Sequence, residues 1–201
     1  MSIAKRAGST RTVKNSVSVH VFHPVATVKC EGVRLYRSQS ARDVSCLLDV
    51  NPSVAEWRCM SASLGSHVPD FQVLDADGKT MFIDAPDRAG LVHVAVVEDA
   101  ALQEDARYKL LSHEEVYDGF RLRNAKDLLR YGDHVTPLGD RLRLLAALDE
   151  HGSLPLWECL NAFHETKPVA GVASLILRGF VDVNLDDGPL GPETSVRRIS
   201  R

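Results

Sequence analysis

The sequence predicts an α/β domain over residues 17–134 and a winged helix-turn-helix over residues 135–201, and three observations lead to this fold class. An Asp-Gly turn separates apolar runs at 71–73 and 81–83, which is the chemistry of a β-hairpin. Further strand patterns mix with helix patterns in the first part of the chain, as in α/β domains. The second part has three short helix patterns and then two strand patterns around a Gly/Pro-rich loop, the order of a winged helix.

The composition is that of a folded chain with a hydrophobic core. Of the 201 residues, 44% are hydrophobic and 25% are charged, and neither a disordered polymer nor a disulfide-stapled miniprotein has this balance. Apolar runs stay well below the roughly 18 residues of a membrane-spanning helix, and no apolar stretch follows the first charges as in a secretory signal. The cysteines at 30, 46, 59 and 159 have no CxxC spacing. We therefore expect a reduced, cytoplasmic protein.

Charge is distributed unevenly along the chain. The net charge is −3, yet residues 1–40 contain seven Lys or Arg and one Glu. Residues 1–16 almost lack large apolar side chains, which predicts a disordered basic arm. Such an arm is typical of a segment that contacts a polyanion, and a solvated chain end is the alternative. The residues predicted to bind DNA are Lys5, Arg6, Arg11, Lys14, Arg34 and Arg37.

The α/β domain begins with alternating Val and polar residues. This alternation predicts one or two strands within residues 16–28. A helix is expected over 38–48, followed by a strand over 54–60 with Trp57 as its core anchor. After the hairpin, the continuously apolar and β-branched run 91–97 predicts a buried central strand. Helix patterns over 100–111 and 122–130 complete the domain.

The second domain follows a Gly- and Pro-containing linker at 132–140. Its first helix, 141–150, is expected to turn Leu142, Leu145, Ala146 and Leu148 inward. Ser153 is expected to cap the second helix, in which Trp157 anchors the core, and Thr166 is expected to cap the third. The predicted segments are helices over 141–150, 153–163 and 167–179 and strands over 180–185 and 194–199.

The third of these helices has few groups that read DNA bases. It carries Lys167 and Arg178 near its ends and only Ser174 between them, without a bidentate base reader. Residues 136–201 contain seven basic and nine acidic residues, an unfavourable field for a phosphate backbone. The sequence favours a winged domain that docks proteins over one that reads DNA.

Two aspartates frame a candidate metal site in the first domain. Asp70 opens one strand of the hairpin and Asp84 ends the other, and both are predicted to face one cation. A helix, a Pro-Asp strand, a hairpin and a second acid form the layout of PD-(D/E)xK nucleases, which have a restriction-endonuclease-like mixed sheet with flanking helices. Their chemistry needs oxygen ligands for Mg²⁺ and a lysine near the attacking water. Pro86 stands where that lysine is expected, and proline has no amine.

Several segments resemble the TnsA family, the endonuclease subunits of heteromeric, Tn-seven-like transposases. The segments are SARDVSCLLDVNPSVAEW, SHVPDFQVLDADGKTMFIDAP, HVAVVEDAAL, RNAKDLLRY and the winged domain. The resemblance extends from about Leu35 to Arg198.

The resemblance assigns roles to single positions. In that family a catalytic Glu lies two residues before the Asp that aligns with Asp43, and this chain has Ala41 there. Asp70 aligns with the metal-binding Asp and Asp84 with a second acidic or Gln position, while Pro86 replaces the lysine. Asp70 and Asp84 are therefore remnant catalytic and metal-binding positions.

The resulting hypothesis is a TnsA-like protein that does not cleave DNA and serves as a scaffold in transposition. The resemblance implies DNA, a DDE-type transposase and an AAA-type ATPase as partners, and a bacterial, nucleoid-associated location. One alternative is an active endonuclease that uses Mg²⁺ and obtains its missing groups elsewhere, for which Lys79 lies unfavourably at a turn tip. Another is a winged-helix transcription regulator. His67 is structural in the simplest interpretation, and a contact to phosphate or to a metal ligand is the alternative.

Overall fold

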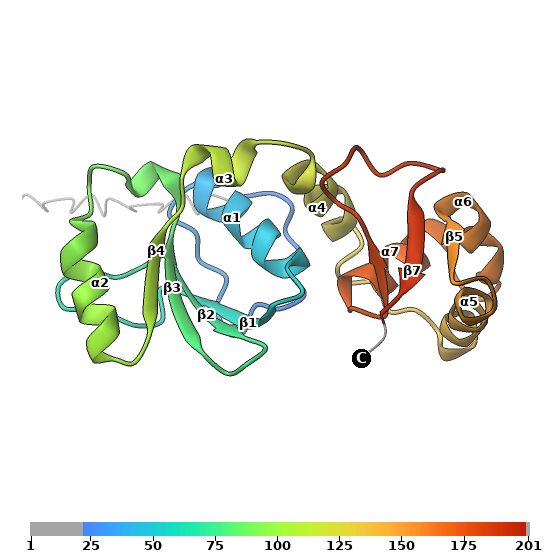
Figure 1. The fold of residues 1–201 in the computed structure, drawn as a ribbon, viewed down its shortest axis with the longest axis horizontal. Helices are drawn as coiled ribbons and strands as arrows, with labels where there is room; N and C mark the ends of the chain where they lie inside the picture. The colour runs from blue at the N-terminus through green and yellow to red at the C-terminus, as the bar shows by residue number, and fades with distance from the viewer. Residues whose placement is uncertain (1–21, 200–201) are drawn as a thin grey trace, which may run out of the picture.

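The computed structural model describes residues 22–199, which form a mixed α/β architecture with helices beside a four-stranded sheet (Figure 1). The predicted arm residues Lys5, Arg6, Arg11 and Lys14 lie outside this range. Within it, the helices are too short or too polar to cross a bilayer.

The first sheet has the order β1-β2-β3-β4 and combines two antiparallel pairs with the parallel pair β3–β4. The predicted helix over 38–48, the predicted strand over 54–60 and the hairpin are confirmed. Ser38 caps the helix by accepting a hydrogen bond from the Ala41 N–H, and Trp57 is fully buried in the core. The elements are α1 (Gln39–Val50), β1 (Val54–Cys59), β2 (Phe71–Asp75), β3 (Thr80–Asp84) and β4 (Arg107–Leu110).

The predicted central strand over 91–97 is wrong, because most of this run belongs to helix α2 (Val94–Gln103). Only Val97 and Ala101 of this helix are buried, while Val96 is 67% exposed. These two residues are four apart and lie on one face of the helix. The apolar run therefore contacts the sheet through a narrow face and is not buried on both sides as a central strand would be. The helix predicted over 100–111 is also wrong beyond Gln103, since the chain turns there and enters β4 as the last strand of the sheet.

Residues 22–28, the described part of the segment predicted as strands, have no regular structure. The buried guanidinium of Arg42 donates hydrogen bonds to the carbonyls of Pro24 and Ala26, and Asp49 accepts from the N–H groups of Val28 and Lys29. Arg42 and Asp49 of α1 thus provide hydrogen-bond partners for backbone groups of residues 24–29. In a strand, these groups would bond to the backbone of a neighbouring strand.

The first domain has three further helical segments, of which one lies between β3 and α2 and two follow β4. They are η1 (Pro86–Arg88), α3 (His113–Tyr117) and α4 (Arg121–Leu129). The predicted helix over 122–130 is confirmed as α4. It packs on α1 and also on the last helix of the chain, so it lies between the two parts of the molecule (Figure 1).

The C-terminal part combines three helices with an antiparallel sheet of order β5-β7-β6. The two predicted strands around the Gly/Pro-rich loop are confirmed as β6 and β7. The elements are α5 (Leu138–His151), β5 (Ser153–Pro155), α6 (Leu156–Cys159), η2 (Leu160–Ala162), α7 (Pro168–Leu177), β6 (Val181–Val183) and β7 (Ser195–Arg198).

Several details of this part differ from the sequence prediction. Helix α5 begins at Leu138, so the linker is shorter than predicted, and it buries Leu144 and Leu148 while Leu142 is 56% exposed and Ala146 is exposed. The buried face is rotated from the predicted one, because α5 packs on the small sheet and also on η2 and α7. Ser153 begins a strand rather than capping a helix.

Two other expected roles in the C-terminal part are wrong. Thr166 does not cap α7, whose N-cap residue is Lys167 without a capping hydrogen bond from its side chain. Trp157 is 49% exposed and does not anchor the core, because the short helix α6 turns it outward.

One hydrophobic core crosses the boundary predicted between residues 134 and 135. Cys46 of α1 and Leu129 of α4 belong to the same buried cluster as Leu144 of α5 and Leu175 of α7. The two parts of the described chain are therefore held together by buried apolar contacts, which exclude water.

Candidate functional site

The structure brings Asp70 and Asp84 together at one end of the hairpin. Phe71 pairs with Ile83, so the residues just before β2 and at the end of β3 lie opposite each other. One oxygen of Asp84 accepts a hydrogen bond from the Asp70 N–H at 2.9 Å, and one oxygen of Asp70 accepts from the Ala85 N–H at 3.0 Å. Asp70 is 3% exposed and Asp84 is fully buried, so this end of the sheet holds a sequestered acid pair.

Three side chains engage the remaining carboxylate oxygens. Arg37 donates from Nη1 to Oδ1 of Asp70 at 2.6 Å. His67 Nε2 lies 2.6 Å from Oδ2 of Asp84, and the Tyr108 hydroxyl donates to the same oxygen at 2.7 Å. Every oxygen of the acid pair thus has a protein partner. We call these five residues, Arg37, His67, Asp70, Asp84 and Tyr108, the carboxylate cluster.

Different elements supply the three partners. Arg37 directly precedes the N-cap of α1, which places its side chain across from β2. His67 comes from the loop between β1 and β2, where its backbone pairs with Leu64. Tyr108 lies on β4, whose parallel pairing with β3 sets it opposite Phe82. The rings of His67 and Tyr108 meet edge to face with centroids 6.2 Å apart, which fixes both beside Asp84.

Burial sets the electrostatics of this cluster. Loss of solvent raises the pKa of Asp70 above its ordinary value, the nearby Asp84 carboxylate adds to the rise, and the Ala85 N–H and Arg37 oppose it. Burial and the hydrogen bond to Asp84 raise the pKa of the Tyr108 phenol. Tyr108 therefore keeps its proton and acts as a donor.

The residues of the carboxylate cluster do not fit a magnesium ion. Magnesium needs oxygen ligands in near-octahedral geometry, whereas these oxygens already accept hydrogen bonds and one faces a guanidinium cation. Among residues 22–199, no group of three or more His, Cys, Asp or Glu side chains is arranged to hold a metal.

Two residues have structural roles at positions where the resemblance to the TnsA family leads us to expect a catalytic Glu and a Lys. Ala41 is 1% exposed and belongs to the same core cluster as Ala85, while Pro86 opens η1. Lys79 lies at the hairpin turn before β3, whereas Asp84 is the last residue of that strand. No amine of the hairpin therefore stands beside the acid pair.

The predicted DNA-binding residues are only partly available in the described range. Arg37 is engaged with Asp70, while Arg34 is exposed and donates to the Val25 carbonyl at 3.4 Å. Many other surface cations pair with acids of the same chain. These ion pairs are Arg58–Glu56, Arg107–Asp75, Lys109–Glu115, Arg121–Asp186, Lys126–Asp43, Arg130–Asp127, Arg143–Glu165, Arg197–Asp182 and Arg198–Asp149.

Helix α7, the third helix of the C-terminal part, is a core helix. Its residues from Ala170 to Leu175 are all buried, as is Leu177. Arg178 at its end donates to the carbonyls of Gly132 and His134. A helix that is apolar on all sides packs in an interior, so α7 offers no polar face to a DNA groove.

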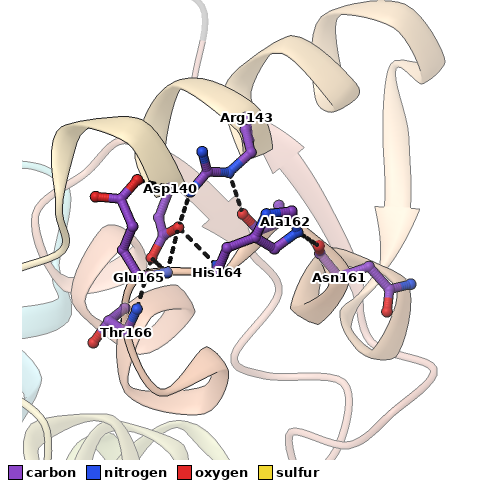
Figure 2. Close-up of polar contacts among 7 residues, drawn as sticks. All are labelled: Asp140, Arg143, Asn161, Ala162, His164, Glu165 and Thr166. Atoms are coloured by element: carbon purple, nitrogen blue, oxygen red, sulfur yellow. Dashed lines mark hydrogen bonds and ion pairs between the residues drawn. The ribbon is translucent and has the colours of Figure 1, made fainter.

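Another buried aspartate, Asp140, organises the turn before α7 (Figure 2). Its carboxylate accepts hydrogen bonds from the N–H groups of His164 at 2.8 Å, Glu165 at 3.1 Å and Thr166 at 3.0 Å, and it also contacts the Arg143 guanidinium. Burial alone would raise the pKa of Asp140, but these donors lower it below its ordinary value. Asp140 therefore holds the turn as a charged group.

The sequence missed Tyr108 and Asp140 as site-forming residues. Tyr108 lies in a stretch that carried a helix pattern, and its contact with Asp84 depends on the β3–β4 pairing. Asp140 stands in a stretch expected to be a linker, where its spacing from His164 gives no local signal.

Comparison with known proteins adds no family assignment. No protein-family model matches this chain, and a search of curated proteins finds no significant match.

Proposed function

We propose that this protein is a TnsA-like, DNA-associated scaffold that does not cleave DNA. The observation that carries the proposal is the carboxylate cluster, in which Arg37, His67 and Tyr108 take the positions around Asp70 and Asp84 that a metal ion and its waters would need. Hydrolysis by such a site requires a metal-activated water and a general base or an ammonium group beside it. This arrangement supports binding and assembly rather than phosphodiester hydrolysis.

The order of the elements supports the nuclease-like part of the proposal. A helix, a hairpin and a parallel last strand surround the acid pair, which is the frame of a restriction-endonuclease-like domain. The three helices and the small antiparallel sheet after residue 135 have the order of a winged helix. We take both domain types as part of the proposal.

Exposed apolar residues support a protein-docking role for the winged domain. Leu138 and Leu142 lie four residues apart on α5 and are 58% and 56% exposed, and Trp157 of α6 is 49% exposed. Aromatic and aliphatic side chains of this kind are common at protein interfaces. Because α7 is buried, the domain lacks an exposed recognition helix for a DNA groove. Its exposed apolar residues suit a protein partner, such as a DDE-type transposase or an AAA-type ATPase.

Binding of DNA is assigned to the basic arm. Phosphate binding depends on Lys and Arg side chains that displace counterions from the nucleic acid. In the described part of the chain, many of the surface Lys and Arg side chains form ion pairs with acids of the same chain. Lys5, Arg6, Arg11 and Lys14 are four closely spaced cations in a segment without acids. They are the natural phosphate contacts of this chain.

A nicking assay tests the proposed lack of cleavage. Full-length protein is incubated with supercoiled plasmid and Mg²⁺ or Mn²⁺, beside the Asp70→Ala variant as the matched control. We expect equal, background nicking by both proteins. Metal-dependent nicking by the wild type that is lost in Asp70→Ala would overturn the proposal.

Deletion of residues 1–16 tests the assignment of DNA binding. We expect the deletion to weaken the affinity about tenfold or more near 0.1 M salt and to reduce the slope of log K against log salt by up to about 4. Lys167→Ala is the matched control and leaves both quantities nearly unchanged. A gel shift over a salt series measures them, and an unchanged slope after the deletion would contradict the assignment.

A further inference from the structure

Two of the cysteines lie side by side on neighbouring segments of the first domain. Cys30 forms an isolated parallel bridge with Trp57, supported by the hydrogen bonds Glu31 N–H to Trp57 O at 2.9 Å and Trp57 N–H to Lys29 O at 3.0 Å. Cys59 follows Trp57 by two residues on β1, so its side chain extends from the same face of the strand as that of Trp57. Cys30, the bridge partner of Trp57, lies on that side as well. The two thiols are therefore held on one side of β1.

The surroundings of these two thiols distinguish them from the other cysteines. Cys30 and Cys59 are both half-buried and pack against the core cluster that contains Trp57, whereas Cys46 and Cys159 are fully buried in the other core. All four are free thiols. Partial exposure lets a small oxidant reach the first pair and not the second.

The protonation of the pair favours one thiolate. Interaction with the Cys30 thiol lowers the pKa of Cys59, and a hydrogen bond from the Leu35 backbone acts in the same direction. The same contact with Cys59, together with burial, raises the pKa of Cys30. Burial raises the pKa of both Cys46 and Cys159 to about 11, so they stay protonated. A lower pKa favours the Cys59 thiolate, so we take Cys59 as the attacking thiol and Cys30 as the resolving thiol, roles that the single-cysteine variants test.

We propose that Cys30 and Cys59 form a redox-active dithiol that a hydroperoxide converts into a reversible disulfide. With hydrogen peroxide, the Cys59 thiolate attacks one oxygen and the O–O bond breaks. The departing hydroxide takes up the proton that the Cys59 thiol had released to solvent, so the products are a sulfenic acid and one water. The Cys30 sulfur then attacks the sulfenic sulfur, the S–O bond breaks, and the hydroxide leaves with the Cys30 proton as a second water. Both sulfurs lose one electron each, both peroxide oxygens gain one each, and a dithiol reductant reverses the change.

The disulfide would fasten the segment before α1 to the edge of the sheet. The closed loop contains α1 and Arg37, the residue that pairs with Asp70. Cross-linking restricts the unfolded chain and stabilises the fold. Oxidation at this pair therefore rigidifies one wall of the carboxylate cluster without changing any residue in it.

Peptide mapping of the full-length protein tests the proposal directly. The protein is treated with a small excess of hydrogen peroxide, blocked with an alkylating agent and digested with trypsin without reduction. Because Lys29 and Arg58 precede the two cysteines, the expected product joins peptide 30–34 to peptide 59–79. Free-thiol titration in denaturant is expected to fall from four to two, and the midpoint of thermal unfolding to rise by roughly 5 to 10 °C.

Two variants identify the roles within the pair. Cys30→Ser is expected to stop at a sulfenic acid on Cys59 that a dimedone probe traps, and Cys59→Ser is expected to leave the remaining thiols unoxidised at the same peroxide dose. A disulfide that involves Cys46 or Cys159, or four free thiols in the wild type after treatment, would overturn the proposal. The wild-type peptide map decides the matter even if one variant fails to fold.

Discussion

Two buried aspartates in different parts of the molecule have opposite electrostatics. Asp140 and Asp70 are almost equally inaccessible, at 0% and 3% exposure, yet the pKa of Asp140 is lowered and that of Asp70 is raised. Asp140 accepts hydrogen bonds from three backbone N–H groups and contacts Arg143, while Asp70 has one backbone donor, Arg37 and a second carboxylate beside it.

The difference shows which carboxylate the fold stabilises as an anion. Donors around Asp140 all favour its charge, which suits a group whose task is to hold a turn. The pair Asp70 and Asp84 keeps two carboxylates close together in a place poor in solvent, which is typical of a functional site rather than a structural one. In this chain, protein donors reach every oxygen of that pair.

The largest expected effect is the loss of the turn before α7. Asp140→Ala leaves three partly buried N–H groups without their acceptor, and each such group costs about 1 kcal/mol. We expect the free energy of unfolding to fall by about 3 kcal/mol or more in urea titrations. Asp149→Ala, which removes a surface ion pair with Arg198, is the control and costs less than about 1 kcal/mol. Equal losses in the two variants would refute the structural role of Asp140.

The amide substitutions compare the two aspartates with less disruption. Asp140→Asn loses the charge that its donors favour, so we expect a loss of about 1 to 3 kcal/mol at neutral pH. Asp70→Asn removes a charge that burial disfavours and keeps an acceptor for Ala85, so we expect a change below about 1 kcal/mol. Chemical unfolding of both variants measures the difference. A larger loss for Asp70→Asn would reverse the comparison.

The smallest expected effect is the pH dependence of the unfolding free energy, to which Asp140 and Asp70 contribute with opposite signs. The contribution of Asp140 is present above its unfolded pKa of about 3.9 and is lost as the pH falls through its lower folded value. For Asp70 the folded pKa is the higher one, so its ionisation reduces stability as the pH rises from about 3.9 through the folded value. The unfolding free energies of wild type and Asp140→Asn are therefore expected to differ by a constant amount above about pH 4 and to converge only on further acidification.

For the other aspartate, acidification is expected to favour the wild type over Asp70→Asn. Protonation of Asp70 restores the folding stability that its ionisation had removed from the wild type. Asp70→Asn has no ionisable group at this position and gains nothing on acidification. Parallel pH profiles for the wild type and both variants would contradict both assignments.

The sequence predicted those elements whose signals are local. Ser38 and the residues after it carry a helix cap and a helix period, and the Asp-Gly turn fixes the hairpin that brings Asp70 and Asp84 together. The pairing of these aspartates followed from the hairpin alone. That part of the candidate site was therefore predictable.

The rest depends on contacts between distant segments. The run 91–97 is apolar without a period, so its helical structure depends on a small contact of Val97 and Ala101 with the sheet edge. The rotation of α5 that exposes Leu142 depends on how the helix packs on the small sheet, on η2 and on α7. The partners Arg37 and Tyr108 lie far from Asp70 and Asp84 in sequence, and no pattern in the chain pairs them.

Binding of Mn²⁺ to the full-length protein tests the central claim most directly, because it probes the acid pair without requiring catalysis. Isothermal titration at neutral pH and moderate salt compares the wild type with Asp70→Ala. The carboxylate cluster predicts no saturable heat for either protein up to millimolar metal, since Arg37, His67 and Tyr108 already satisfy the oxygens. One-site binding by the wild type that disappears in Asp70→Ala would contradict the account.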